Sequence, residues 1–193
     1  MKPFIFEGGF TVATTRLIPL HSGKGRTVAE ALDRVTDYVE NPEKTNGGNL
    51  VTAYQCNQSI ADQEFLFSKR QYAVITGREW KDNDVIAYHL RQSFKPGEIT
   101  PELANKIGYD LAMSLTKGKH AFIVCTHVDK QHIHSHIVFN STAIDCTRKF
   151  RNFWRSSFAV RRISDKCCNA DSIALQYGTS MKRIKKAIAL WEI

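Results

Sequence analysis

The sequence predicts an α+β fold of two layers, in which a central, largely antiparallel sheet carries helices on one face. Short strand-like runs interleave with helical patterns along the chain. Two of these runs, residues 121–127 and 132–140, are separated by only a few residues typical of a turn. So short a connection requires antiparallel pairing, because parallel strands need a crossover of a dozen residues or more. The face of the sheet away from the helices is expected to be open to a ligand.

The first predicted strand and helix precede Pro42. Residues 11–18 are rich in β-branched side chains, which favour strands. Thr27 and Glu30 form the capping-box pattern that begins a helix. Pro42 indicates that this helix ends at about Asn41, because the residue before a proline disfavours the helical conformation. The apolar face of the helix consists of Val28, Leu32, Val35 and Val39.

The remaining elements also alternate between strands and helices. A helix is expected from Pro101, because Thr100 is a good N-cap residue and proline is favoured at the first helical position. In chain order, the other predicted elements are a strand at 50–56, a helix at 59–76, a strand at 85–94, the two strands of the hairpin, and a helix at 150–168.

Histidines gather in the predicted hairpin. Four of the chain's seven histidines lie within residues 127–136. His132, His134 and His136 alternate with other residues, so a strand places them on one face, successive ones about 6.5–7 Å apart. Antiparallel pairing brings His127 back beside them. Neutral imidazole is the commonest metal-binding side chain, and the cluster therefore predicts a metal site.

The donor set favours a catalytic over a structural metal site. Structural zinc sites use cysteine, alone or with histidine, and fill all four positions, whereas no cysteine lies in this cluster. The first choice of ligands is His127, His134 and His136. Asp129 and His132 are alternatives, either as a variable ligand or as groups that orient the ligating imidazoles.

Length and composition indicate one domain over residues 1–168, followed by a basic, amphipathic helical tail over 169–193. A hydrophobic content of 42% is enough for a core. No apolar run is long enough to span a bilayer, and the N-terminal residues lack the apolar stretch of a signal peptide. The five scattered cysteines then indicate reduced thiols in a cytoplasmic protein without membrane insertion.

A net charge of +8 and a pI of about 9.3 indicate a polyanionic partner. Residues 147–166 combine seven lysines and arginines with a single acid, and four aromatic residues are interleaved with them at 150–158. This mixture suits a nucleic-acid strand, whose phosphates meet cations and whose bases stack on rings. An amphipathic helix with its aromatics in the core is an equally open alternative. The cations expected to contact DNA are Arg91, Arg148, Lys149, Arg151 and Arg155. For Arg91, a surface ion pair is the alternative.

With these features placed, the chain resembles the relaxase, or mobilisation nuclease, domains of conjugative plasmids and transposons. The nearest group is the MobA/VirD-type (MOBP) branch of the HUH endonucleases. The motif begins at His127 and ends at Asn140, with the spacing His-x-Asp-x-x-His-x-His-x-His-x-x-x-Asn. Other segments that look like this family are 38–45, 87–98 and 161–165. The likeness spans roughly residues 12–168 and leaves the tail outside.

The resemblance implies an activity and its residues. Relaxases nick single-stranded or locally melted DNA at an origin of transfer, and a tyrosine stays joined to the 5′ end. That tyrosine falls on Tyr38, and the family's metal ligands fall on the three histidines chosen above. Mn or Mg is the expected ion, with Zn, Co or Ni as alternatives. Asp129 or His132 is expected to act as the base. An accessory relaxosome protein and a coupling protein are the implied partners.

Two other functions remain compatible with the sequence. A rolling-circle replication initiator would use the same chemistry. A non-catalytic, basic DNA-binding module would use the histidines for a structural metal or for none. In that case Tyr38 would be a tyrosine packed at the edge of its helix.

Overall fold

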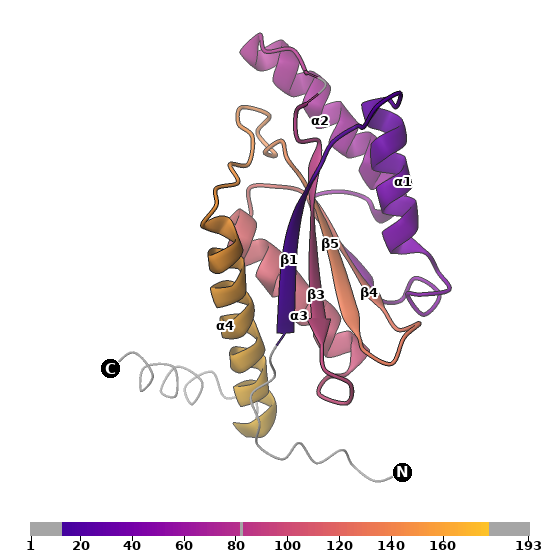
Figure 1. Ribbon diagram of the computed structural model, residues 1–193, viewed down its shortest axis with the longest axis vertical. Coiled ribbons are helices and arrows are strands. Elements are labelled where there is room, and N and C mark those ends of the chain that lie inside the picture. Colours follow the sequence, from indigo (N-terminus) through magenta and orange to yellow (C-terminus); the bar gives the residue numbers. More distant parts are fainter. Residues whose placement is uncertain (1–12, 82, 178–193) are drawn as a thin grey trace.

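The computed structural model describes the backbone of residues 13–81 and 83–177 (Figure 1). In chain order its elements are β1 (Ala13–Leu20), α1 (Val28–Glu40), β2 (Val51–Tyr54), the 3-10 helix η1 (Gln58–Ile60), α2 (Ala61–Thr76), β3 (Ala87–Phe94), α3 (Pro101–Thr116), β4 (Phe122–His127), β5 (His134–Asn140) and α4 (Ser156–Tyr177). Within the described ranges, no helix is long and apolar enough to cross a membrane.

The five strands form one sheet in the order β1-β3-β5-β4-β2, and every neighbouring pair is antiparallel. The predicted α+β class, antiparallel sheet and β4–β5 hairpin are thus confirmed. β5 is the central strand. His134 pairs with His127 of β4, while His136 lies opposite Cys125 of β4 and Arg91 of β3. The register therefore brings three neighbouring strands together around the histidines.

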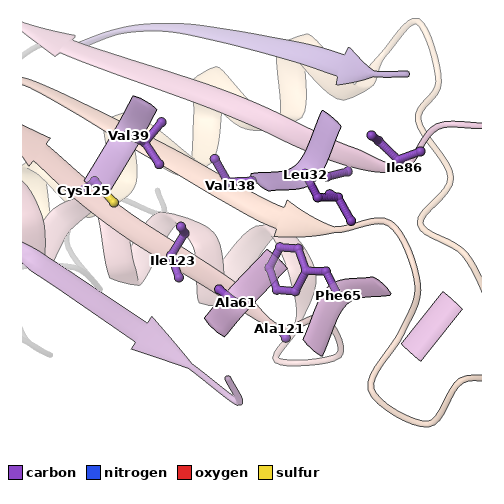
Figure 2. Packing of buried hydrophobic residues seen from close by; sticks show 10 residues of the cluster. Leu32, Val39, Ala61, Phe65, Ile86, Ala121, Ile123, Cys125 and Val138 are labelled. Atoms are coloured by element: carbon purple, nitrogen blue, oxygen red, sulfur yellow. The ribbon is translucent and has the colours of Figure 1, made fainter. Parts of the chain in front are cut away.

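Helices cover both faces of the sheet, which departs from the predicted two layers with helices on one face. Phe122 and Val124 of β4 belong to an apolar cluster with α3 and α4. Ile123 and Cys125 belong to the cluster that α1 and α2 form on the opposite face (Figure 2). The physical reason is that every residue of β4 and β5 is buried, so both faces of these strands need cover.

The histidines share the face that α1 and α2 partly cover. His134, His136 and Val138 lie two residues apart along β5 and therefore share one face, and Val138 packs in the cluster of Figure 2. The histidines lie at the end of the sheet where α1 finishes and the β4–β5 turn begins (Figure 1). The site is therefore at the edge of a packed layer, rather than on a fully open face.

His132 does not belong to the strand, which corrects the prediction that the strand itself holds it, although its ring lies 5.2 Å from that of His134. β5 begins at His134, and His132 is exposed in the turn. Because His127 pairs with His134, residues 128–133 do not pair with β4, and the turn is longer than the few residues predicted between 127 and 132. Its last residue, Ile133, accepts a hydrogen bond from Phe94 N (3.0 Å), which ties the turn to β3.

The helix boundaries follow their capping residues. The capping box of Thr27 and Glu30 begins α1, and Thr100 caps α3 with Pro101 at its first position. α4 begins at Ser156, not at 150, and continues to Tyr177. The division of the chain after residue 168 stays a prediction. The helix expected at 181–191 lies outside the described residues.

Candidate metal centre and active site

Three imidazoles from the hairpin converge on one point. His127, His134 and His136 are all buried, and one ring nitrogen of each lies within 4.8 Å of the others. Ligand nitrogens at about 2.0–2.1 Å from one tetrahedral, zinc-sized ion are about 3.4 Å apart, so a pair at the 4.8 Å limit has to close by about 1.4 Å. The three nitrogens lie close enough together that they could hold one ion after that closure. The geometry thus fits a single ion.

A hydrogen bond on the outer nitrogen orients each of these rings. His127 Nε2 bonds to the carbonyl of Val39 (2.8 Å), and His134 Nδ1 bonds to the carbonyl of His132 (3.3 Å). A carbonyl only accepts, so both of these nitrogens carry the proton. The lone pairs are then left on His127 Nδ1 and His134 Nε2. This arrangement of an outer donor and an inner lone pair is the usual one for ligating histidines.

His136 is oriented by another histidine, His89 of β3. His136 Nδ1 lies 2.7 Å from His89 Nε2. The other nitrogen, His136 Nε2, is buried and has no hydrogen-bond partner among the described residues. A buried polar atom without a partner costs about 1–3 kcal/mol. A bound cation would remove that cost, and this orphaned nitrogen is the sharpest structural sign of a metal site.

The electrostatics favour neutral rings with available lone pairs. Burial is the main cause that lowers the pKa of His127 and of His134. Burial, followed by repulsion from His89, lowers the pKa of His136 to about 2. Burial also lowers the pKa of His89 to about 4, with a smaller contribution from the Arg91 charge. The cluster is therefore uncharged at neutral pH, which is the state that binds a cation.

Tyr38 stands directly beside the three imidazoles. Its ring centroid lies 5.6 Å from that of His136 and 6.0 Å from that of His127, with edge-on geometry. The side chain is 50% exposed, so a ligand from solvent can reach it. Tyr38 also immediately precedes Val39, whose carbonyl holds His127. The predicted tyrosine and the predicted ligands are thus brought together, while the role of each stays a prediction.

A lysine that the sequence pattern did not single out completes this side of the site. Lys44 Nζ lies 4.5 Å from the centre of the Tyr38 ring. Its loop is fixed at both ends, because Lys44 O accepts from Val128 N (2.9 Å) and the buried Thr45 hydroxyl donates to Asn41 O (2.9 Å). The signal that could have found Lys44 is its place in the segment 38–45, which resembles the family.

Asp129 and His132 lie on the outer side of the histidines. Both are exposed in the turn, and the His132 ring lies 5.2 Å from that of His134. Within the described part of the chain, no hydrogen bond joins either residue to Tyr38. Arg91 is exposed on the histidine face, directly opposite His136. It is one of the five predicted DNA-binding residues, and the only one of these next to the site.

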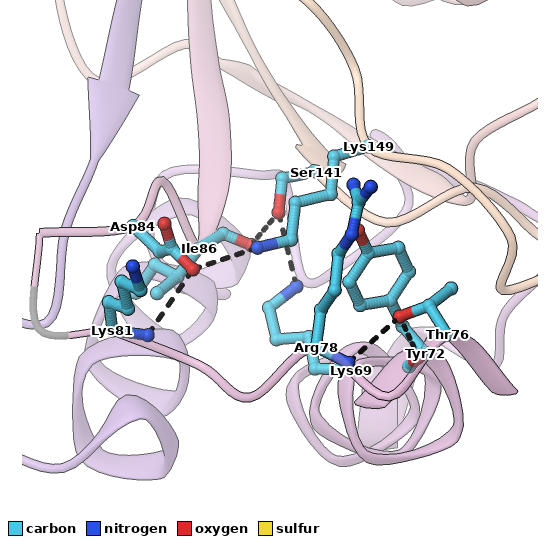
Figure 3. Close-up of polar contacts among 9 residues, drawn as sticks. All are labelled: Lys69, Tyr72, Thr76, Arg78, Lys81, Asp84, Ile86, Ser141 and Lys149. Carbon is cyan, nitrogen blue, oxygen red and sulfur yellow. Dashed lines mark hydrogen bonds and ion pairs between the residues drawn. The ribbon is translucent and has the colours of Figure 1, made fainter. Parts of the chain in front are cut away.

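The other four predicted DNA-binding residues, Arg148, Lys149, Arg151 and Arg155, follow the far end of β5 (Figure 1). Lys149 is already engaged, because its Nζ pairs with Asp84 Oδ2 at 2.8 Å (Figure 3). The same Nζ lies 4.1 Å from the centre of the Trp80 ring. The three arginines are exposed. At this end of the sheet, these four residues do not contact the three histidines.

Asn140, the last residue of the motif, also lies at the far end and is buried. Its Oδ1 accepts from Lys69 Nζ and from Thr142 N (3.1 Å), and its Nδ2 donates to Ser68 Oγ (2.7 Å). Lys69 also reaches Ser141 (Figure 3). Asn140 thus ties α2 to the end of β5 and takes no part in the metal centre.

Most of the chain is similar to known proteins. A family model described as relaxase, MobA/VirD2-like, nuclease domain matches residues 38–173. The matched segment includes Tyr38 and the whole histidine motif. A solved structure from work on the molecular basis of vancomycin resistance transfer in Staphylococcus aureus superposes with a TM-score of 0.56 at 12% identity, covering 88% of this chain and 96% of that one. This second likeness concerns the fold alone.

Two curated relatives give the sequence comparison. The group II intron-interrupted relaxase LtrB of Lactococcus lactis is 33% identical over 178 residues, which cover 78% of this chain and 31% of that protein. A protein rlx of Staphylococcus aureus is 29% identical over 164 residues, covering 85% of this chain and 45% of that protein. The chain therefore spans from about a third to somewhat under half of the length of these relatives.

Proposed function

Because the chain belongs to the MobA/VirD2-like relaxase nuclease family, we propose that it nicks one DNA strand at an origin of transfer and holds the cut end covalently on Tyr38. The observation that supports this most directly is the position of a half-exposed tyrosine ring 5.6 Å from a buried imidazole whose inner nitrogen has no partner. The proposal gives the protein a part in conjugative mobilisation. Single-stranded or locally melted DNA would be its substrate.

The three imidazoles would hold a divalent cation, with Mn or Mg as the first choice. When bound, the cation would polarise a non-bridging oxygen of the scissile phosphate and neutralise its charge. His127 and His134 would be held in place by the backbone carbonyls of Val39 and His132, and His136 by His89. These partners let the ligands keep one orientation while the site is loaded or emptied.

Tyr38 would be the nucleophile. Its hydroxyl oxygen would form a bond to the scissile phosphorus as the bond to the 3′ oxygen breaks, so a 5′-phosphotyrosine and a free 3′-hydroxyl result. The phenolic proton would pass to a base or to solvent, which the 50% exposure of Tyr38 admits. The number of phosphoester bonds is unchanged in this step, so the reverse reaction can rejoin a strand without another energy source.

Two cations flank this chemistry. Lys44 lies over one face of the Tyr38 ring, and Arg91 lies across from His136 on β3. Both would hold phosphates of the strand beside the tyrosine. Asp129 and His132 remain candidates for the base, through movement of their exposed turn or through a water. Their lack of a described hydrogen bond to Tyr38 makes direct solvent transfer the simpler path.

A covalent-adduct assay tests the proposal. The purified chain is incubated with Mn²⁺ or Mg²⁺ and a random-sequence pool of single-stranded oligonucleotides, and protein–DNA species that survive SDS are isolated and sequenced. Wild type is expected to form adducts, with the nucleotide located on Tyr38 by peptide mass spectrometry. Tyr38→Phe is expected to form none, while the matched control Tyr109→Phe forms as much as wild type.

Two outcomes would contradict the proposal. Adducts from Tyr38→Phe at the wild-type level would show that another residue is the nucleophile. Binding of the pool without any adduct, under every metal condition, would favour the non-catalytic DNA-binding module instead.

A further inference from the structure

A second group of cations lies around a cavity at the other end of the sheet from the histidines. The cavity, of about 550 Å³, is formed by the turn between α3 and β4 and by residues 143–151. A backbone hydrogen bond from Ile144 N to Lys119 O (2.9 Å) holds these two segments together. The cavity therefore joins parts of the chain that are some 25 residues apart in the sequence and belongs to the fixed part of the fold.

The lining of this cavity is strongly basic. Its five lysines and arginines face a single acid, Asp145. They are Lys117, Lys119, Arg148, Lys149 and Arg151. Lys149 pairs with Asp84, but the other four form no ion pair with any described residue, and all four are exposed. Like charges gathered without counter-ions are costly in the free protein, so this arrangement favours a polyanionic ligand.

Exposed aromatic rings continue the surface from Arg151. Phe153, Trp154 and Phe158 are 62%, 74% and 55% exposed. Trp154 and Phe158 meet edge to face at 6.2 Å, and Arg155 lies 4.8 Å from the centre of the Trp154 ring. These three rings are thus exposed to solvent, and do not lie in the core where an amphipathic helix would place them. Flat rings beside guanidinium groups can stack with unpaired bases while the cations meet phosphates.

We propose that this basic cavity and the adjoining aromatic surface form a separate binding site for single-stranded DNA, remote from the metal centre. A protein partner is the weaker reading, because the centres of protein interfaces are depleted in charged residues and in lysine above all. The inference rests on the proposed function for the identity of the ligand as DNA. It goes beyond that function by giving the strand a second point of attachment.

The two sites cannot hold the same nucleotides. The six residue steps from His134 to Asn140 place them about 20 Å apart along β5. The cavity also borders Phe150, which packs in the cluster on the α3 and α4 face, whereas the histidines are on the opposite face. The strand at the second site is therefore a part of the DNA away from the cut.

The test measures binding without cleavage. Fluorescein-labelled oligothymidylate of about 16 nucleotides, the upper end of the site sizes known for such surfaces, is titrated by anisotropy in EDTA over a series of salt concentrations. Lys117→Gln with Lys119→Gln is expected to weaken binding and to reduce the slope of log K against log salt by about 1.4, at about 0.7 for each lost phosphate contact. The matched control replaces two exposed arginines of α1 and α2, Arg34→Gln with Arg70→Gln, and should keep the slope.

A second pair of variants tests the rings. Trp154→Ala is expected to weaken binding about tenfold, the size of one lost base stack, while Trp154→Phe keeps most of the affinity. The proposal is overturned if the double lysine variant has the same salt slope as the arginine control, or if Trp154→Ala binds like wild type. Neither readout needs metal or Tyr38, so failure here is distinct from failure of the adduct assay.

Discussion

Replacement of His89 is the most informative single perturbation of the metal centre. His89 holds the outer nitrogen of His136 at 2.7 Å. In His89→Phe, a ring of similar size remains but the hydrogen-bond partner is lost. His136 then keeps its place on β5 but loses the group that fixes its tautomer and its rotation. Loss of such an outer partner typically weakens metal affinity 10- to 100-fold.

The expected magnitude follows from this factor. At a metal concentration far above both dissociation constants, a 10- to 100-fold weaker affinity reduces the metal-induced stabilisation by about 1.4–2.7 kcal/mol. We expect the increase of the unfolding midpoint on addition of Mn²⁺ to shrink accordingly, and isothermal titration to give the same ratio of dissociation constants. His89→Gln is the matched variant, since its amide oxygen can accept from His136 Nδ1 and should restore part of the affinity.

The reasoning would be refuted by equal Mn²⁺ affinity in wild type and His89→Phe. That result would mean that packing alone orients His136, or that His136 does not bind the ion. His134→Ala separates these two cases, because it removes a proposed ligand outright. If His134→Ala also kept full affinity, the ion would have to bind elsewhere.

Three further predictions concern one lysine beside the site and two buried titratable side chains. Lys44→Gln should reduce adduct formation about tenfold with little change in the unfolding midpoint, because it removes a charge that contributes to phosphate binding but not to the core; an unchanged adduct yield would exclude Lys44 from the site. Burial raises the pKa of Glu40 to about 7, so the folded protein keeps a proton that the unfolded chain releases from about pH 4.5 upward. The free energy of unfolding should therefore fall as pH rises from 4.5 to 7, and chemical denaturation of Glu40→Gln should show a flatter profile; an identical slope would contradict this. Burial lowers the pKa of Lys69 to about 7, so the unfolded chain binds the additional proton between about pH 7 and 10.5. Stability should rise with pH across that window in wild type, and the rise should be smaller in Lys69→Met; thermal melts at pH 7 and pH 9 compare the two.

The local part of the site could be predicted from sequence, because strand alternation is a local property. Strand alternation predicts that His134 and His136 share one face, and the antiparallel pairing of the hairpin predicts that His127 lies beside them. The same alternation continues into the turn, whose length no local pattern reports, so it does not show that His132 lies outside the strand while its ring stays 5.2 Å from that of His134. His89 was missed for a different reason: its contact with His136 depends on the register between β3 and β5, which are some 45 residues apart.

The layering and the basic surface depended on tertiary packing. The run 121–126 is apolar at successive positions, which indicates a strand that is buried on both of its faces. Only the tertiary contacts of α1 and α2 show which helices cover the second face. Likewise, Arg148 and Arg151 were expected near DNA, yet their distance from the histidines follows from the direction of β5. Lys117 and Lys119 line the same cavity as these arginines because the fold brings the α3–β4 turn next to residues 143–151.

The hydrogen bond between His127 and the carbonyl of Val39 links β4 to the last turn of α1. At one end of this bond is the His127 ring, which would bind the cation, and at the other is the backbone carbonyl of the residue that follows Tyr38. A shift of the last turn of α1 would therefore move the hydrogen-bond partner of that ring, and a ring fixed on an ion would in turn restrain that turn. Under the proposed function, binding of a metal and positioning of the Tyr38 phenol would be coupled through this hydrogen bond.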